Sequence, residues 1–115
     1  AVLLAWGRLL LARNEPEKAQ EFLEQSRSKG EDSSTLYGAL GDVYFKLKAW
    51  DKAAENYKQA LQNRRRNIDW RRSMGIALAQ QGRKKEAELK FREVLAFTPD
   101  DVEGWRELRK LGVRY

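Results

Sequence analysis

Carboxylates are the side chains of this sequence that could do acid–base chemistry, because its 115 residues include no cysteine and no histidine. Thiol nucleophiles, imidazole bases and the usual zinc ligands are therefore excluded. Glu86 and Glu88 lie two residues apart in a stretch with helical periodicity, so they point to different faces and do not form an acid–base pair. Asp100 and Asp101 precede the last predicted helix, where carboxylates accept hydrogen bonds from free N–H groups.

A phosphate-binding loop is not indicated either. The segment GIALAQQGRK has two glycines ahead of a basic pair, but their spacing is not that of a phosphate loop. The segment also falls on a predicted helix and its end instead of following a strand. We therefore predict no catalytic residue, no metal ligand and no cofactor, and we expect that the protein is not an enzyme.

The composition favours one compact helical domain. Hydrophobic residues make up 42% of the chain and charged residues 35%, which is typical of a folded protein with a large polar surface. Long runs of strong helix formers and only two prolines predict an all-α fold. The apolar segment 1–12 is too short to span a bilayer and contains Arg8, so we expect no membrane insertion. The absence of cysteine is compatible with cytoplasm or periplasm and leaves the location open.

A period of 34 residues organises the chain. It relates three glycines, each of which follows an apolar residue: Gly7, Gly41 and Gly75. Three further columns keep the same register, one of alanine and two of large residues: Ala19, Ala53 and Ala87; Leu10, Tyr44 and Leu78; Leu23, Tyr57 and Phe91. Five columns in one register indicate internal repetition.

Each repeat consists of two predicted helices joined by a polar turn. In the second repeat one apolar stripe covers residues 37–47 and another covers residues 53–61. Two helices cross closely only where small residues meet, so we expect Gly41 to face Ala53, with Tyr57 filling the space alongside. This packing would offset the cost of about 0.5–1 kcal/mol that glycine carries inside a helix.

The pattern resembles the tetratricopeptide repeat, a helix–turn–helix unit of 34 residues with glycine, alanine and aromatic residues at fixed positions. The resemblance implies an all-α, right-handed α-solenoid of three such repeats, about 1–33, 34–67 and 68–101, with a capping helix at 102–115. It covers almost the whole chain as a single domain, 1–115, which we expect to be a fragment of a longer array.

Three positions depart from the family pattern. Arg71 stands where a bulky residue is usual, and Arg65 and Glu31 stand where proline is usual. We expect Trp70, beside Arg71, to take over the bulky role in a slightly rotated helix.

Stacked helical hairpins form a superhelix whose concave face is lined by the first helix of each unit. The resemblance implies a non-catalytic protein–protein interaction scaffold that binds a partner peptide or protein segment in this groove, within a larger complex such as a secretion or envelope-polymer export assembly. Small groove residues between apolar and charged ones favour an amphipathic or mixed apolar and charged segment as ligand. The groove residues carried over from the family are Arg8, Leu11, Gly38, Asp42, Phe45, Lys46, Arg72 and Ile76.

Phe45 and Arg72 are the groove residues from which we expect most of the binding energy, since aromatic and arginine side chains dominate protein interfaces. The alternative for Phe45 is packing against its neighbouring helix alone. Gly38 has two interpretations as well: a missing side chain that leaves room for a ligand, or a tolerated surface glycine.

Family members that bind the acidic C-terminal tails of heat-shock chaperones clamp the terminal carboxylates with basic and amide side chains. The matching positions here are Leu4, Arg8, Ala39, Asp69 and Ser73. Only Arg8 has the required charge, so we do not expect this chain to bind such tails.

Positive charge is concentrated in the middle of the chain. Residues 46–92 carry fourteen basic and five acidic side chains, within a net charge of +6 for the whole sequence. This favours an alternative function, binding of nucleic acid or another polyanion. Its candidate contacts form two groups that the hairpin geometry places at opposite edges: Arg64, Arg65 and Arg66, and Arg83, Lys84 and Lys85. Alternatively, the same charges only keep one edge of the open solenoid solvated and the protein soluble.

The first predicted helix, 1–13, is apolar nearly all round, which is typical of a helix covered on both sides. Earlier repeats of a longer array could cover it, or the helix could mediate self-association. The alternative is an unusually apolar first helix that its own partner helix buries in part.

Overall fold

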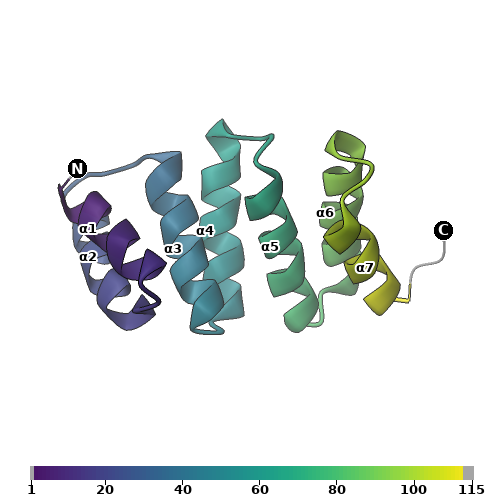
Figure 1. Cartoon of the computed structure of the whole chain (residues 1–115), viewed down its shortest axis with the longest axis horizontal. Helices are drawn as coiled ribbons and strands as arrows, with labels where there is room; N and C mark the ends of the chain where they lie inside the picture. Colours follow the sequence, from purple (N-terminus) through teal and green to yellow (C-terminus); the bar gives the residue numbers. More distant parts are fainter. Residues whose placement is uncertain (1, 113–115) are drawn as a thin grey trace.

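The computed structural model describes residues 2–112 and folds them into helices without any strand. The expected all-α architecture is confirmed (Figure 1). The helices are α1 (Val2–Ala12), α2 (Pro16–Ser28), α3 (Ser34–Lys46), α4 (Trp50–Asn63), α5 (Ile68–Gln80), α6 (Lys84–Phe97) and α7 (Val102–Lys110). The capping helix was expected at 102–115 and instead ends at Lys110; residues 113–115 of that range, like Ala1, lie outside the described residues.

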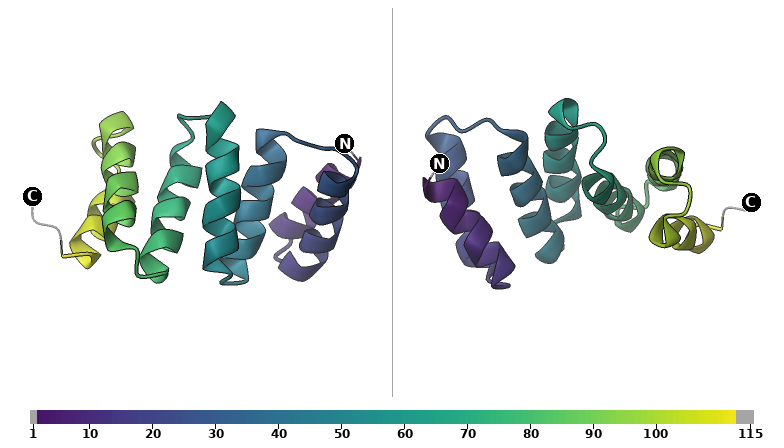
Figure 2. Two further views of the ribbon diagram at one scale, coloured as in Figure 1. Left: turned by 180° about the vertical axis from the view of Figure 1, so that it is seen from behind. Right: turned by 45° about the horizontal axis from the view of Figure 1, so that its top comes forward.

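Three helical hairpins, α1–α2, α3–α4 and α5–α6, stack side by side along the longest axis, and α7 follows the last hairpin (Figure 2). The result is an elongated solenoid with extents of 45 × 24 × 21 Å. Helix α3 contacts α1 and α5 in addition to its sequence neighbours. The first helices of the hairpins therefore form one layer, which is the layer that lines the concave face in solenoids of helical hairpins.

The three glycines of the repeat lie where the two helices of each hairpin cross. A Cβ at Gly41 would come within 2.6 Å of the Tyr57 ring, and a Cβ at Gly75 would come equally close to Phe91. Gly7 meets Leu23 in the same way. The close crossing expected at Gly41 is confirmed, but its nearest neighbour is Tyr57 itself and not Ala53. The glycine and the large residue of each repeat thus form one packing unit.

The turns inside the hairpins share a feature that was not read from the sequence. Asn14, Lys48 and Gly82 all have positive φ, of 61°, 61° and 78°, and they are related by the same 34-residue period. This left-handed residue ends the first helix of each hairpin. It also fixes the direction in which the second helix begins.

Side-chain caps start the helices that follow the longer connections. The Ser33 hydroxyl oxygen accepts a hydrogen bond from the Leu36 N–H at 3.1 Å, and Asn67 Oδ1 accepts one from the Trp70 N–H at 2.9 Å. Asp101 Oδ2 caps α7 by accepting from the Gly104 N–H at 2.7 Å. Such caps contribute about 1 kcal/mol each, so the starts of α3, α5 and α7 are well defined.

No helix within residues 2–112 combines the length and apolar character needed to cross a bilayer.

Candidate functional site

A hollow of about 260 Å³ lies on the concave face, between α1, α3 and α5. Three of the predicted groove residues, Arg8, Leu11 and Asp42, line it. The other lining residues are Ala12, Thr35, Ala39 and Trp70. The hollow has apolar walls with one cation and one carboxylate at its edges, so it is suited to a chain segment that carries both kinds of group.

Trp70 is the lining residue that sequence reasoning assigned to another role. Its indole lies over the backbone of Gly38, where an added Cβ would overlap the ring. The room for a ligand expected at Gly38 is therefore absent, because Trp70 fills it. Gly38 is buried and is not a surface glycine either.

Arg71 itself fills the position where the family has a bulky residue, and Trp70 does not replace it there. Its side chain is 11% exposed and donates to Glu93 Oε1 at 2.6 Å and to the Arg65 carbonyl oxygen. The guanidinium also lies 5.5 Å from the centre of the Phe97 ring. Packing and pairing of its long stem let arginine stand where a bulky residue is usual.

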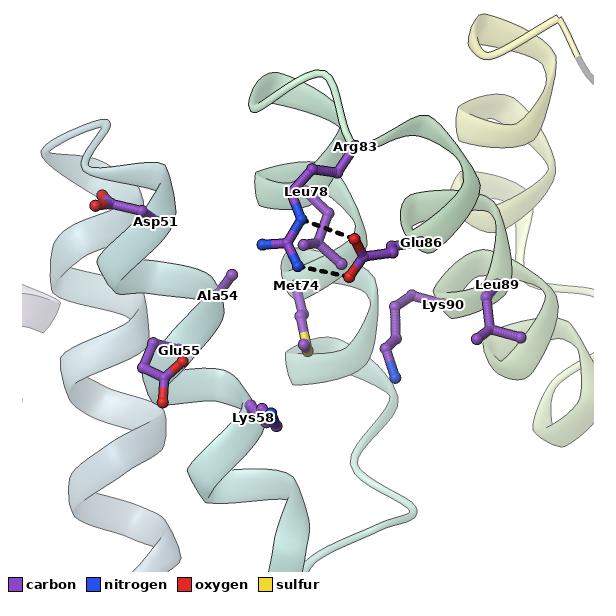
Figure 3. A pocket seen from close by; sticks show the side chains of 10 residues that line it. All are labelled: Asp51, Ala54, Glu55, Lys58, Met74, Leu78, Arg83, Glu86, Leu89 and Lys90. Carbon is purple, nitrogen blue, oxygen red and sulfur yellow. Dashed lines mark hydrogen bonds and ion pairs between the residues drawn. The ribbon is translucent and has the colours of Figure 1, made fainter.

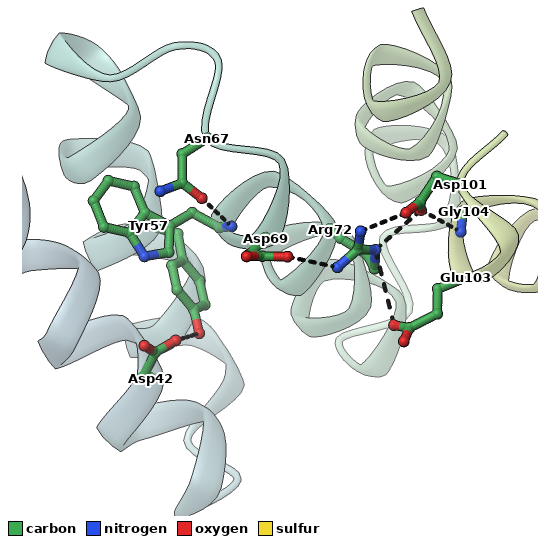
Figure 4. A network of polar contacts seen from close by, with 9 residues as sticks. Asp42, Tyr57, Asn67, Asp69, Arg72, Asp101, Glu103 and Gly104 are labelled. Atoms are coloured by element: carbon green, nitrogen blue, oxygen red, sulfur yellow. Dashed lines mark hydrogen bonds and ion pairs between the residues drawn. The ribbon is translucent and has the colours of Figure 1, made fainter. Parts of the chain in front are cut away.

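Asp42 is held at the wall of the hollow by a hydrogen bond from Tyr57. The Tyr57 hydroxyl donates to Asp42 Oδ1 at 2.5 Å (Figure 4). Burial raises the pKa of Asp42, while the hydrogen bond from Tyr57 and the charge of Lys46 lower it. Burial and the carboxylate of Asp42 in turn raise the pKa of Tyr57. Oδ2 of Asp42 accepts no hydrogen bond from the part of the chain that the structure describes, so it remains available as an acceptor.

A binding role in the groove requires a free guanidinium, but Arg72 is held by carboxylates of the protein itself. Its Nη2 contacts Asp101 Oδ1 at 2.5 Å and its Nε donates to Asp101 Oδ2 at 3.1 Å. Asp69 and Glu103 complete a carboxylate cluster around the guanidinium, at 3.0 and 3.8 Å (Figure 4). The guanidinium lowers the pKa of Asp101. Arg72 thus links α5 to the first turn of α7.

The remaining predicted groove residues lie outside the hollow. Phe45 is half-buried and packs edge-on against Trp50 of α4, with ring centres 5.2 Å apart. This is the packing against the neighbouring helix that the sequence left open as an alternative. Ile76 packs against the core, and Lys46 is exposed at the end of α3.

The two basic groups lie at opposite edges of the solenoid, as predicted. Residues 64–66 are exposed in the connection between α4 and α5, and residues 83–85 are exposed at the start of α6 (Figure 1). Arg83 is paired with Glu86, with hydrogen bonds of 2.9 and 2.6 Å. Binding of a polyanion to these groups stays a prediction.

Helix α1 has one covered and one open side. Gly7 and Leu10 are buried, so its partner helix covers part of the apolar surface. Val2, Trp6 and Leu9 remain 71%, 50% and 46% exposed. The apolar face made by Val2, Ala5, Trp6 and Leu9 is thus open in this chain, and self-association through it stays a prediction.

Comparison with known proteins identifies the repeat. The family model described as "Tetratricopeptide repeat" matches residues 32–100. A curated relative, "Protein O-mannosyl-transferase Tmtc2" of Drosophila melanogaster, is 34% identical over 68 residues, which are 58% of this chain and 7% of that protein. The chain therefore spans only a small part of this relative.

Solved structures share the fold over almost the whole chain. The second tetratricopeptide domain of human RPAP3, in complex with the HSP70 peptide SGPTIEEVD, has a TM-score of 0.84 at 20% identity, covering 96% of this chain and 92% of that one. The first such domain of Spaghetti (RPAP3), bound to the HSP90 peptide SRMEEVD, has a TM-score of 0.86 at 22% identity, covering 96% and 88%. MamA has a TM-score of 0.88 at 17% identity, covering 95% and 64%. These likenesses concern the fold.

Proposed function

Given that this chain belongs to the tetratricopeptide repeat family, we propose that it is a non-catalytic scaffold that holds a segment of a partner protein on its concave face. The hollow between α1, α3 and α5 is the observation that carries the proposal. It combines apolar surface from Leu11, Ala39 and Trp70 with the charges of Arg8 and Asp42. Recognition surfaces of this kind bind extended or helical segments through a few apolar anchors and oriented polar contacts.

The ligand segment presents an apolar side chain to Trp70 and a cationic or N–H donor group to Asp42. Asp42 favours this pairing because Oδ2 is open while Oδ1 is held by Tyr57. The charge of Asp69, on α5, also raises the pKa of Asp42 and so adds to the negative potential at that carboxylate. A partly desolvated carboxylate gains more from a charged donor than an exposed one does.

The proposed ligand differs from those named for the RPAP3 domains, whose HSP70 and HSP90 peptides end in two glutamates, a valine and an aspartate. Among the positions of the carboxylate clamp, this chain has one cation, Arg8, and has an aspartate at 69. The carboxylate at 69 would therefore repel an acidic tail at a position where those ligands need a positive charge. The same carboxylate attracts a segment that contains basic residues.

Affinity capture with a matched pair of variants tests the proposal. Ala12→Lys places a cation at an exposed residue that lines the hollow, where it repels a basic segment and occupies space. Gln25→Lys makes the same change in charge at an exposed position of α2. We expect the partner protein to be recovered by the wild type and by the α2 variant, and lost at least about tenfold with the α1 variant, with nuclease present throughout.

Equal recovery by both variants would remove the site from the concave face. Recovery seen only in a parallel capture without nuclease would identify nucleic acid as the ligand and would contradict the scaffold function. Circular dichroism of both variants checks that they keep the helical fold.

A further inference from the structure

A second groove runs along the outer side of the solenoid, between α4 and α6. Two adjoining hollows, of about 260 and 500 Å³, share Lys58, Met74 and Lys90 and therefore form one continuous depression. Figure 3 shows the half that reaches Arg83 and Glu86, with Met74 and Leu78 of α5 between the two outer helices. The other half reaches the connection between α4 and α5. This groove is separate from the concave hollow, with which it shares no residue.

The two halves of the groove differ in charge. In the half shown in Figure 3, three acidic residues balance three basic ones: Asp51, Glu55 and Glu86 against Lys58, Arg83 and Lys90. The lining of the other half contains no acidic residue and four basic ones, together with Leu61, Gln62 and Met74; the basic residues are Lys58, Arg65, Arg71 and Lys90. The groove is therefore strongly cationic at one end only.

The positive charge of the cationic half is only partly neutralised by nearby carboxylates. Arg71 and Lys90 share the single carboxylate of Glu93, at 2.6 and 3.3 Å. Lys58 and Arg65 form no ion pair among residues 2–112. The Arg71 Nε is buried without a hydrogen-bond partner. Because that atom is closed to solvent, an acceptor that enters this half meets instead the positive charges of Lys58 and Arg65, which are exposed.

The floor of the cationic half is apolar. Leu61 and Met74 lie there with 8% of each side chain exposed. A ligand that fits this half combines negative charge at its edges with an apolar group toward the floor. Inorganic anions lack the apolar group. Single-stranded nucleic acid is typically held by stacking rings, yet none of the described residues that line this half is aromatic.

We propose that the cationic half of the outer groove binds an acidic segment of a protein, with carboxylates against Lys58, Arg65 and Lys90 and an apolar side chain on Leu61 and Met74. The scaffold then has two faces of opposite preference. Its concave hollow takes a segment with a basic group, and its outer groove takes an acidic one.

Met74 provides a direct readout, because it is the only methionine of the sequence and lies on the floor of the groove. The chain is labelled with ¹³C at the methionine methyl group and titrated with a synthetic peptide in which two glutamates flank a leucine on each side. We expect the Met74 methyl resonance to shift in a saturable manner. A peptide with serine in place of the leucine should bind more weakly and should leave the resonance close to its free position.

Two variants with equal change in charge locate the contact. Lys58→Gln with Arg65→Gln removes two exposed charges of the groove, and the hydrogen bond from Arg71 to the carbonyl of residue 65 does not depend on that side chain. Arg106→Gln with Arg109→Gln removes two exposed charges of α7. We expect the first pair to weaken peptide binding about tenfold and the second pair to leave it within about twofold.

Several results would overturn the proposal. Peptide binding that leaves Met74 unshifted places the contact elsewhere. Equal weakening by both variants reduces the effect to general charge attraction. A shift of Met74 with tripolyphosphate or oligothymidylate, but not with the glutamate peptide, assigns the groove to phosphate ligands instead of acidic protein segments.

Discussion

The indole of Trp70 lies directly over the backbone of Gly38, and together they join α5 to α3 across the concave face. Trp70 also lines the hollow that we propose as the partner site. One side chain therefore fixes the spacing of two neighbouring hairpins and forms part of the surface between them. Changes at Gly38 should act on stability and on binding through the same ring.

Gly38→Ala should destabilise the fold. The added Cβ overlaps the Trp70 ring, and such overpacking costs about 1–3 kcal/mol, which exceeds the helix gain of about 1 kcal/mol from replacing glycine. In a Trp70→Ala background the overlap is gone, so the same change should be stabilising. Urea unfolding of the four proteins measures this reversal of sign; the same sign in both backgrounds would show that the contact does not control the effect.

Asp42→Asn should become more favourable as the pH rises. Burial raises the pKa of Asp42 above its ordinary value of 3.8, so the folded state binds a proton more strongly than the unfolded state. The stability linked to this proton is complete below pH 3.8 and is lost as the pH rises through the folded pKa. Asparagine does not titrate and still accepts the hydrogen bond from Tyr57. Thermal unfolding at pH 3 and pH 7 should show the variant gaining on the wild type at the higher pH.

Tyr57→Phe provides the control for this pH dependence. Removing the hydroxyl removes a hydrogen bond that lowers the pKa of Asp42. The pKa of Asp42 should therefore rise further, which NMR titration of the Asp42 carboxyl carbon measures. An unchanged pKa would mean that the hydrogen bond does not form in solution.

Asp101 should show the opposite pH behaviour. Arg72 lowers the pKa of Asp101 below 3.8, so the stability from this contact is present above pH 3.8 and is lost as the pH falls through the folded pKa. Asp101→Ala removes the cap of α7 as well as the ion pair, and should cost about 1–2 kcal/mol at pH 7. Asp101→Asn keeps the cap and should cost less. The gap between wild type and Asp101→Asn should narrow in acid; a gap independent of pH would contradict the ion pair.

The open face of α1 should make the chain associate at high concentration. Trp6 and Leu9 are 50% and 46% exposed and neighbour each other on the helix, and exposed apolar patches of this kind drive contacts. Trp6→Ser with Leu9→Ser should abolish a concentration-dependent increase in sedimentation coefficient. Leu89→Ser with Val102→Ser, at residues 53% and 65% exposed, is the control and should leave it unchanged. No association in the wild type would contradict the prediction.

The internal period predicts the hairpins and the close crossing at Gly41, because both depend on contacts within one repeat. Contacts between repeats were harder to infer. The interpretation of Gly38 required knowing that Trp70, on the next hairpin, faces it. The family register places Arg72 in the groove. Nothing local in the sequence indicates that Asp101, 29 residues away, pairs with Arg72 once α7 is folded back.

The outer groove escaped sequence reasoning for a related reason. Charges were grouped along the chain, into 64–66 and 83–85, and these groups do lie at opposite edges. Lys58 and Lys90 come from different helices and have no signal in common in the sequence, yet they line the same groove. Only the rotation of α4 and α6 about their axes brings them to one surface.

Site-specific photo-cross-linking determines whether the concave face holds the partner. A benzophenone amino acid replaces Ala12, which lines the hollow, or Gln25, which is exposed on α2. Both proteins are illuminated with the partner recovered in the capture experiment. We expect a cross-link from position 12, mapped by mass spectrometry to one segment with apolar and basic residues, and little from position 25. A cross-link from position 25 without one from position 12 would contradict this expectation.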